Sequence, residues 1–418
     1  MGSSMSESLR VRRTFSILLG TGVGVQIILF LGMLVLARLY SPDAFGEYGF
    51  YAGMAATIAI VAGGRFDYLA FMKGTNDYGK NDFYFSSLVV CLAICCFVFI
   101  GAWAAKGWWA ERILFEWWIL FFVFSYSIFY LGTQNLLAQG DYKFFSKIRF
   151  YQVIIQVSVG LCAFSLWPYY GLSISFVGVQ LVLGVILLFR ILNNNRFPRP
   201  SKIILVYKKF YSKALVNSLI SILQYSAPFA PVFFGSIHYS QGEVGAYFLF
   251  AQVAAAPLSI FRRSLLNFLN AEFYSVEKLT IILKEYSRVG GYFILFFLLL
   301  FFVGGGVLAF WSEYIVGLLF GKQWLMYVGL LLPLVMYYVI DSCLQPITTL
   351  LPLWGVSRIS LLFEIFRFLL IYFGGGFVVF FMDVSFYHFV MCFILSMVFV
   401  YFMQALYIIF YLRRQSCV

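Results

Sequence analysis

Charged residues are scarce in this sequence. They make up only 11% of its 418 residues, against roughly 25% in a typical soluble domain. Hydrophobic residues make up 63%, and the mean hydropathy is +0.92. A water-soluble core cannot bury that much apolar surface, so we expect the lipid bilayer to be the solvent of most of the chain. This composition excludes an ordinary soluble domain.

Histidine and paired cysteine are also scarce. The chain has two histidines and seven cysteines, no CxxC pair occurs, and most cysteines lie inside apolar runs. We therefore expect no metal site, and we interpret the cysteines as buried, inert thiols. No loop combines an acid–base pair with histidine, and no long aqueous segment could hold a sugar-nucleotide site. We therefore predict that the protein is not an enzyme.

Long apolar runs fill the chain instead. About twelve of them reach the roughly 20 residues that a helix needs to span a bilayer. We place them near residues 15–37, 45–71, 83–105, 113–137, 148–168, 172–192, 213–237, 244–270, 288–310, 327–351, 359–382 and 386–411. The runs are continuous and do not alternate, which excludes a membrane β-barrel. The predicted fold is an all-α polytopic membrane protein.

Basic residues lie mainly in the N-terminal segment, the even-numbered loops and the tail; the fourth loop, for example, is assigned Lys143, Lys147 and Arg149. The positive-inside rule places such loops in the cytoplasm. The net charge of +12 therefore indicates orientation and not nucleic-acid binding, and both termini are predicted to be cytoplasmic. The sixth loop, 193–212, is basic and begins with a helix-breaking stretch. Its residues 202–210 fit either an amphipathic helix on the cytoplasmic leaflet or a plain basic loop.

One segment of the sequence occurs twice. A short polar turn leads into an apolar helix from Arg38 onward, and the same layout returns from Ile237 onward. The matching pairs share one offset: Tyr40/Tyr239, Ser41/Ser240, Gly46/Gly245, Tyr48/Tyr247, Ala52/Ala251, Ala55/Ala254 and Ala56/Ala255. Both turns follow an odd-numbered helix, so the repeats are parallel and related by a pseudo-two-fold axis along the membrane normal. We predict two six-helix bundles, 1–192 and 213–418, joined by the linker 193–212.

Charges inside the apolar runs are candidate site residues, because an arginine at the bilayer centre costs about 2.5–3.5 kcal/mol on insertion scales. Arg65 and Arg263 fall near the cytoplasmic ends of the second and eighth helices. There they would form a pair of cations at the inward mouth of a cavity, where a guanidinium binds phosphate oxygens in pairs. Snorkelling to headgroups is the alternative, and it is favoured for one of Arg262 and Arg263. Asp67 lies two residues from Arg65, so we expect it to face a cation on a neighbouring helix.

Three further charges, Asp341, Glu364 and Arg367, are the deepest in the predicted spans. Glu364 and Arg367 lie three residues apart on one helix and can form an ion pair. The pair could be structural, or these residues could line a cavity, with Arg367 among the substrate-binding cations. An acidic residue at that depth could also bind Na⁺ or H⁺ as a coupling ion. Both alternatives stay open, and no other cofactor is predicted.

Prolines and glycines indicate where helices bend. Pro228 and Pro231 lie deep in the seventh predicted helix, and Gly32 is one of several glycines in the first. Each proline removes a backbone hydrogen bond and favours a kink. We predict that the first and seventh helices bend as a cavity changes its open side. Static kinks, which are common in membrane helices, are the alternative.

Two stretches carry a family resemblance. The first is LARLYSPDAFGEYGFYAGMAATIAIVAGGRFDYLAFM, beginning at Leu36. The second is Leu319-Phe320-Gly321-Lys322-Gln323-Trp324, followed by LLPLVMYYVIDSCLQPITTLLPLWGVSR. Together they resemble the bacterial polysaccharide exporters, the Wzx-type O-antigen flippases. That family belongs to a superfamily that includes lipid II flippases and MATE-like multidrug exporters.

The resemblance implies a flippase with two lobes that work by alternating access. Its substrate would be an oligosaccharide linked to undecaprenyl diphosphate, moved from the cytoplasmic to the outer face of the bacterial inner membrane. Membrane lipids and other glycan assembly proteins, such as a polymerase and a chain-length regulator, would be its partners. A cation-coupled drug exporter of the same fold is an alternative, which Arg65, Arg263 and Arg367 disfavour. A membrane glycan polymerase is another; it would normally carry a large outward loop, and the longest outward segment here, 311–326, is short.

Overall fold

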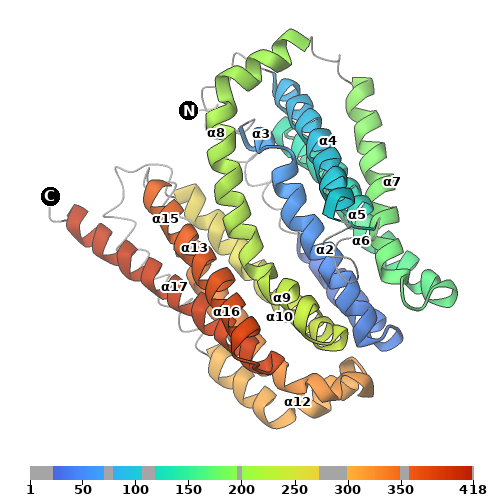
Figure 1. Ribbon diagram of the computed structural model, residues 1–418, viewed down its shortest axis with the longest axis vertical. Helices are drawn as coiled ribbons and strands as arrows, with labels where there is room; N and C mark the ends of the chain where they lie inside the picture. The colour runs from blue at the N-terminus through green and yellow to red at the C-terminus, as the bar shows by residue number, and fades with distance from the viewer. Residues whose placement is uncertain are drawn as a thin grey trace, which may run out of the picture. The chain divides into compact units, whose positions relative to one another are not determined.

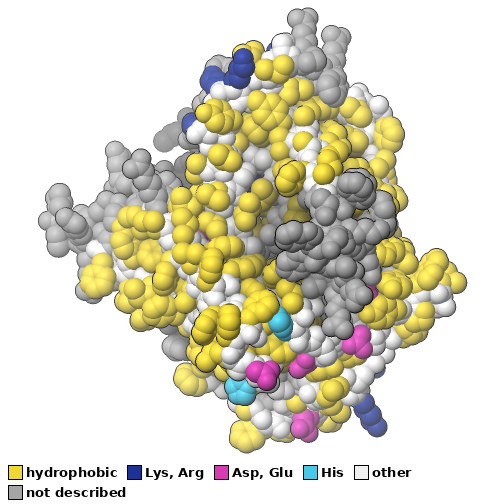
Figure 2. All heavy atoms as spheres, viewed as in Figure 1, with side chains coloured by type: hydrophobic (Ala, Val, Ile, Leu, Met, Phe, Trp, Pro, Cys, Tyr) yellow, Lys and Arg dark blue, Asp and Glu magenta, His cyan; other side chains and the backbone are white. Residues whose placement is uncertain are grey.

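The computed structural model describes residues 22–69, 79–105, 118–194, 200–272, 299–348 and 357–416. These residues are helical apart from short turns, and none of them forms a strand (Figure 1). Within them, eleven helices are long and apolar enough to cross a membrane. Figure 2 shows hydrophobic side chains over most of the visible surface, with few charged ones among them. The all-α polytopic fold is confirmed.

The chain divides into two compact units. Unit 1 contains the chain up to Leu29 and from Glu47 to Ile237, and unit 2 contains Phe30–Gly46 and the chain from His238 onward. The units therefore do not separate in the predicted linker 193–212. The reason is that residues of this segment begin a long helix, α8 (Pro200–Ser226), which is held in unit 1. The amphipathic stretch 202–210 forms its first turns.

Unit 1 contains most of α2 and seven further α-helices. Their bounds are α2 (Pro42–Ala62), α3 (Phe66–Leu69), α4 (Lys80–Ala105), α5 (Trp118–Gln139), α6 (Tyr142–Leu166), α7 (Gly171–Asn194), α8, the short η1 (Ala227–Phe229) and α9 (Ala230–His238). Glycines let α5 and α7 approach closely: a Cβ on Gly132 would lie 2.8 Å from Leu187, and one on Gly184 would lie 2.9 Å from Ile128. Small residues at helix contacts are typical of packing in membranes, where hydrophobic burial does not drive association. On α8, Val206 and its neighbours pack against α3 and α4.

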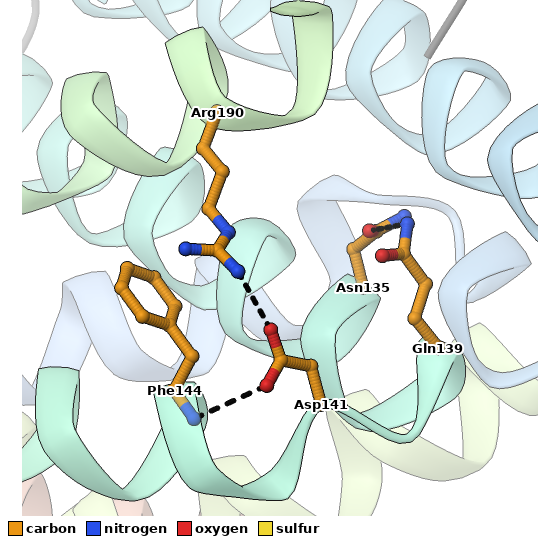
Figure 3. Close-up of polar contacts among 5 residues, drawn as sticks. All are labelled: Asn135, Gln139, Asp141, Phe144 and Arg190. Carbon is orange, nitrogen blue, oxygen red and sulfur yellow. Dashed lines mark hydrogen bonds and ion pairs between the residues drawn. The ribbon is translucent and has the colours of Figure 1, made fainter. Parts of the chain in front are cut away.

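The turn between α5 and α6 is fixed by polar contacts. Gly140 has a φ of +82°, which a glycine adopts without strain. Asp141 then caps α6 by accepting the Phe144 N–H at 3.3 Å, and its other carboxylate oxygen accepts from Arg190 of α7 at 2.8 Å (Figure 3). The Arg190 guanidinium lies 3.7 Å above the Phe144 ring. Arg190 is therefore a structural residue of unit 1.

The seventh predicted span is interrupted at its prolines. Helix α8 ends at Ser226, a single 3₁₀ turn carries Pro228, and α9 carries Pro231 in its first turn. Gly53 of α2 faces this turn so closely that a Cβ there would lie 2.2 Å from the Phe229 ring. By contrast, the first helix is continuous over 22–39, with Gly32 buried inside it. Bending of either helix during transport stays a prediction.

Unit 2 contains the end of the first helix and all elements after His238. They are α10 (Gln241–Glu272), η3 (Leu300–Gly304), α12 (Gly305–Leu319), η4 (Lys322–Leu330), α13 (Leu331–Thr348), α15 (Ser357–Leu369), η5 (Leu370–Gly374), α16 (Gly375–Phe381) and α17 (Phe386–Ser416). Both η3 and η5 are single π-helical turns that end in a glycine triplet. Such turns locally disrupt the regular hydrogen-bond ladder of a helix. Gly305 also packs closely, since a Cβ there would lie 1.9 Å from Met336.

The repeated turn of the sequence is also repeated in space. Ser41 accepts the N–H of Ala44 at the start of α2, and Ser240 accepts the N–H of Glu243 at the start of α10, both at 3.3 Å. The repeat-related glycines meet where these two helix starts cross. A Cβ on Gly46 would lie 2.1 Å from the Gln241 carbonyl oxygen, and one on Gly245 would lie 1.9 Å from that of Pro42. Neither position has room for a side chain.

The two stretches that carry the family resemblance contact each other within unit 2. Arg38 donates from Nε to the Leu319 carbonyl oxygen at 3.1 Å and also donates to that of Leu318. In return, Gln323 and Trp324 donate to the Ala37 carbonyl oxygen at 2.7 and 2.8 Å. Carbonyl groups at a helix C-terminus have no partner within the helix. Arg38 therefore caps the C-terminus of α12, and Gln323 and Trp324 cap the C-terminus of the first helix.

The repeated tyrosines flank these turns. Burial raises the pKa of Tyr40 to about 12, and burial likewise raises the pKa of Tyr239. Both hydroxyls are therefore neutral at physiological pH. Tyr239 donates to the Val384 carbonyl oxygen at 2.8 Å.

Candidate functional site

The buried charges of unit 2 are paired with one another. Arg262 of α10 forms an ion pair with Asp341 of α13 at 3.0 Å, and Arg367 forms one with Glu364 on α15. The second pair is the one that their spacing allows. Tyr401 of α17 hydrogen bonds to Asp341, and its ring centroid lies 6.0 Å from the Arg367 guanidinium. Among the described residues, Arg262, Asp341, Glu364 and Arg367 thus form two ion pairs that Tyr401 connects.

Arg262 therefore contacts a carboxylate of its own unit, which the sequence did not indicate. Its side chain is 29% exposed, whereas Asp341 is 5% exposed. The partner lies 79 positions away in the chain, and no local pattern connects the two. The side chain of Arg263 lies outside the described residues, so its predicted pairing with Arg65 stays a prediction.

Arg65 lies in a turn and not on a helix. Helix α2 ends at Ala62, and Gly64 and Arg65 then both adopt left-handed backbone conformations, with φ of +58° and +56°. This conformation is uncommon for a residue with a side chain and often occurs at functional sites. The turn directs the guanidinium to α5, where Nη1 donates to the Tyr130 hydroxyl at 3.1 Å.

Asp67 also lies next to Tyr130. Both Asp67 and Arg65 interact electrostatically with the Tyr130 hydroxyl, and Asp67 is only 6% exposed. The expectation that Asp67 faces away from Arg65 assumed one continuous helix. The left-handed turn between α2 and α3 breaks that geometry, so Arg65 donates to Tyr130 and the Asp67 carboxylate lies near enough to affect the same hydroxyl.

Arg149 is a further candidate site residue, which the sequence analysis places in a loop. It was assigned to a cytoplasmic loop, but α6 begins at Tyr142 and carries Arg149 about 10 Å along its axis. Nη1 of Arg149 donates to Oε1 of Gln152 at 2.8 Å, and the guanidinium carbon lies 5.9 Å from the centre of the Phe129 ring. The spacing of Arg149, Gln152 and Gln156 on one helix face was the available signal.

Further tyrosines and glutamines occur on the neighbouring helices and turns of unit 1. Gln156 donates to the Tyr48 hydroxyl of α2 at 3.4 Å. Tyr126 of α5 interacts electrostatically with Arg149 and stacks on Phe176 of α7, with ring centroids 5.7 Å apart. The group therefore combines a guanidinium with hydroxyl and amide groups and aromatic faces. Such groups bind anions and hydroxyl-rich molecules.

Arg149 differs from three other arginines on helices, which form ion pairs. Arg190, Arg262 and Arg367 each have a carboxylate partner. In the part of the chain that the structure describes, the contacts of the Arg149 guanidinium are with neutral groups. Over the same residues, no group of three or more histidine, cysteine, aspartate or glutamate side chains could hold a metal ion.

Comparisons with known proteins agree with the family resemblance. The model of a family described as "Polysaccharide biosynthesis protein" matches residues 35–329. No match was found among curated proteins. The inward closed conformation of MurJ, a lipid II flippase, matches with a TM-score of 0.68 and 12% identity, covering 95% of this chain and 88% of that one.

Two multidrug-transporter structures also match. A MATE transporter in complex with MaD3S has a TM-score of 0.57 and 15% identity, covering 98% of this chain and 96% of that one. An inward-facing MATE family transporter of the MOP superfamily has a TM-score of 0.53 and 13% identity, covering 96% and 95%. At these identities the likeness shows a shared fold.

Proposed function

Because the chain belongs to the polysaccharide biosynthesis protein family, we propose that it is a flippase for an oligosaccharide linked to a polyprenyl diphosphate. It moves an O-antigen-like repeat unit from the cytoplasmic to the outer face of a bacterial inner membrane. The protein transports its substrate by alternating access, in which a cavity opens to one side of the membrane and then to the other, and no covalent bond is made or broken. Both termini are cytoplasmic, in line with the positive-inside rule.

The observation that carries this proposal is the presence of arginines among tyrosines and glutamines in the helices of a multi-pass membrane protein. Arg65 donates to Tyr130 of α5, and Arg149 lies near Tyr126 of the same helix. A lipid-linked sugar diphosphate has an anionic head that suits guanidinium groups and hydroxyls that suit tyrosine and glutamine. Its lipid tail stays in the bilayer.

The acidic residues of unit 2 favour this substrate over a cationic drug. A drug exporter needs a carboxylate that is available to its substrate. Asp341 and Glu364 instead hold Arg262 and Arg367. A role of Asp341 in coupling to Na⁺ or H⁺ remains part of the proposal, since either ion would compete with Arg262 for the carboxylate.

Complementation tests the proposal. A bacterial strain that lacks its own O-unit flippase receives the full chain, and surface glycan is measured. We expect glycan display to return for at least one lipid-linked repeat unit. Correct insertion without display of any lipid-linked glycan of the source organism would refute the proposed function.

A variant pair tests the role of Arg65 in the same assay. Arg65→Ala is expected to lower display, and Arg65→Lys is expected to keep part of it, because lysine retains the charge but loses the planar fork. Lys143→Ala, which removes an exposed cation from α6, is the control and should display glycan normally. Normal display by Arg65→Ala would show that this cation does not contribute.

A further inference from the structure

One cation of unit 1 has a guanidinium that the described carboxylates do not neutralise. Arg149 lies inside α6, about 10 Å beyond the start of that helix. Burial of an arginine in a membrane bundle is unfavourable, and such residues usually pair with an acid or bind a ligand. Arg190, Arg262 and Arg367 follow the first pattern. Arg149 contacts an amide and aromatic rings.

We propose that Arg149 and Gln152 form the subsite that binds a phosphate group of the transported lipid-linked diphosphate. The assignment rests on the proposed function and adds a residue that the sequence placed in a loop. The group that this subsite binds is a phosphate ester anion at the depth of the membrane-spanning helices.

The contacts of Arg149 leave it suited to a bidentate anion. Only Nη1 donates to Gln152, and arginine has further N–H donors in a planar fork that matches two phosphate oxygens. Gln152 is 7% exposed and accepts through Oε1, which fixes the orientation of the guanidinium. Arg149 is partly exposed.

Lipid headgroups are a less suitable explanation for this position. The lysines of the same helix, Lys143 and Lys147, are exposed and are free to extend toward a membrane surface. Arg149 instead lies against α5, where it contacts Phe129 and interacts with Tyr126. Its direction is therefore into unit 1.

A second cation, Arg65 in the turn between α2 and α3, lies beside α5. Tyr126 and Tyr130 of α5 are four residues apart, so they lie one turn apart on one helix face. Arg149 is next to the first tyrosine, and Arg65 donates to the second. Gln156 and Tyr48 continue the polar face on the other side and would meet sugar hydroxyls.

Binding of a defined probe tests the subsite. The full chain is purified into phosphatidylcholine nanodiscs, and the affinities for farnesyl diphosphate and for neutral farnesol are measured. Arg149→Gln is expected to weaken diphosphate binding about 10- to 100-fold and to leave farnesol binding unchanged. Arg149→Lys should fall between the variant and the wild type. Lys147→Gln, which removes the same charge from the exposed face of α6, should bind as the wild type does.

Thermal unfolding separates a binding role from a structural one. Because no described carboxylate depends on Arg149, Arg149→Gln is expected to unfold at the same temperature as the wild type or higher. A lower unfolding temperature together with unchanged diphosphate affinity would show a structural residue and overturn the proposal.

The remaining outcomes are equally decisive. If the wild type binds farnesyl diphosphate no better than farnesol, the phosphate subsite is overturned, while glycan display in the complementation assay decides the proposed function separately. If the wild type binds and Arg149→Gln binds equally well, only the subsite assignment fails. If phosphatidylglycerol added to the nanodisc displaces the probe from the wild type in proportion to its content, Arg149 binds bulk headgroups, and the assignment to substrate is overturned.

Discussion

The arginines that lie beside tyrosines in the two compact units differ in whether they have a carboxylate partner. In unit 2, Arg262 and Arg367 are held by Asp341 and Glu364, and Tyr401 joins the two pairs. In unit 1, Asp141 likewise holds Arg190, whereas Arg149 lies among neutral partners. The difference indicates that depth within an apolar run does not by itself identify a binding residue. The carboxylate partners of Arg190, Arg262 and Arg367 account for those charges within the fold, and Arg149 is the candidate for a ligand.

Separating the buried ion pair of α15 is expected to have the largest effect. Arg367→Met leaves the Glu364 carboxylate buried without its partner, which costs about 3–5 kcal/mol. The double variant Glu364→Leu with Arg367→Met removes both charges and should recover most of this loss. Thermal unfolding of the purified variants measures both. Equal stability of the single variant and the wild type would mean that this cluster is not structural.

The repeated turn offers a test at a place where the two copies agree. Gly245→Ala puts a Cβ 1.9 Å from the Pro42 carbonyl oxygen, and the shift that follows should lower stability by about 1–3 kcal/mol. Gly306→Ala is the matched control within unit 2, because nothing lies within 4 Å of that position. It should be neutral or stabilising by up to about 1 kcal/mol. The unfolding temperatures of the two variants are compared. Equal values would contradict the close approach of the two helix starts at Gly245.

An ion pair introduced into unit 1 is expected to change the free energy of unfolding little and to weaken diphosphate binding. Gln152→Glu places a carboxylate three residues from Arg149, the separation that Glu364 and Arg367 have in unit 2. We expect diphosphate affinity to fall about tenfold, or about 1.4 kcal/mol, with stability unchanged or slightly raised. Gln152→Asn, which shortens the side chain but adds no charge, is the control. Unchanged affinity of Gln152→Glu would remove the proposed contrast between the units.

Much of the fold was accessible from the sequence. Apolar runs long enough to span a bilayer predicted the helices, because a lipid-exposed backbone must satisfy its hydrogen bonds within each segment. The repeat identified Gly46 and Gly245 as matching positions, and the structure shows that the backbones of the two helix starts lie too close there for a side chain. The interruption of the seventh span at Pro228 follows from the missing backbone N–H.

Other features depended on contacts that no local pattern records. The linker became part of α8 because Val206, Phe210 and Ala214 pack against α3 and α4. Arg149 was assigned to a loop because the start of α6, at Tyr142, precedes the apolar run. Helix ends are set by capping residues such as Asp141 as well as by hydropathy.

By itself, then, the sequence determined the solvent, the helical class, the family resemblance and the repeated turn. These depend on composition and on spacing within short segments. Only the tertiary structure decided which charges are compensated. An ion pair such as Arg262 with Asp341 joins residues that are 79 positions apart, and a side chain reaches its partner only after the helices have packed. The same packing left Arg149 beside tyrosine and glutamine, with no described carboxylate to neutralise it.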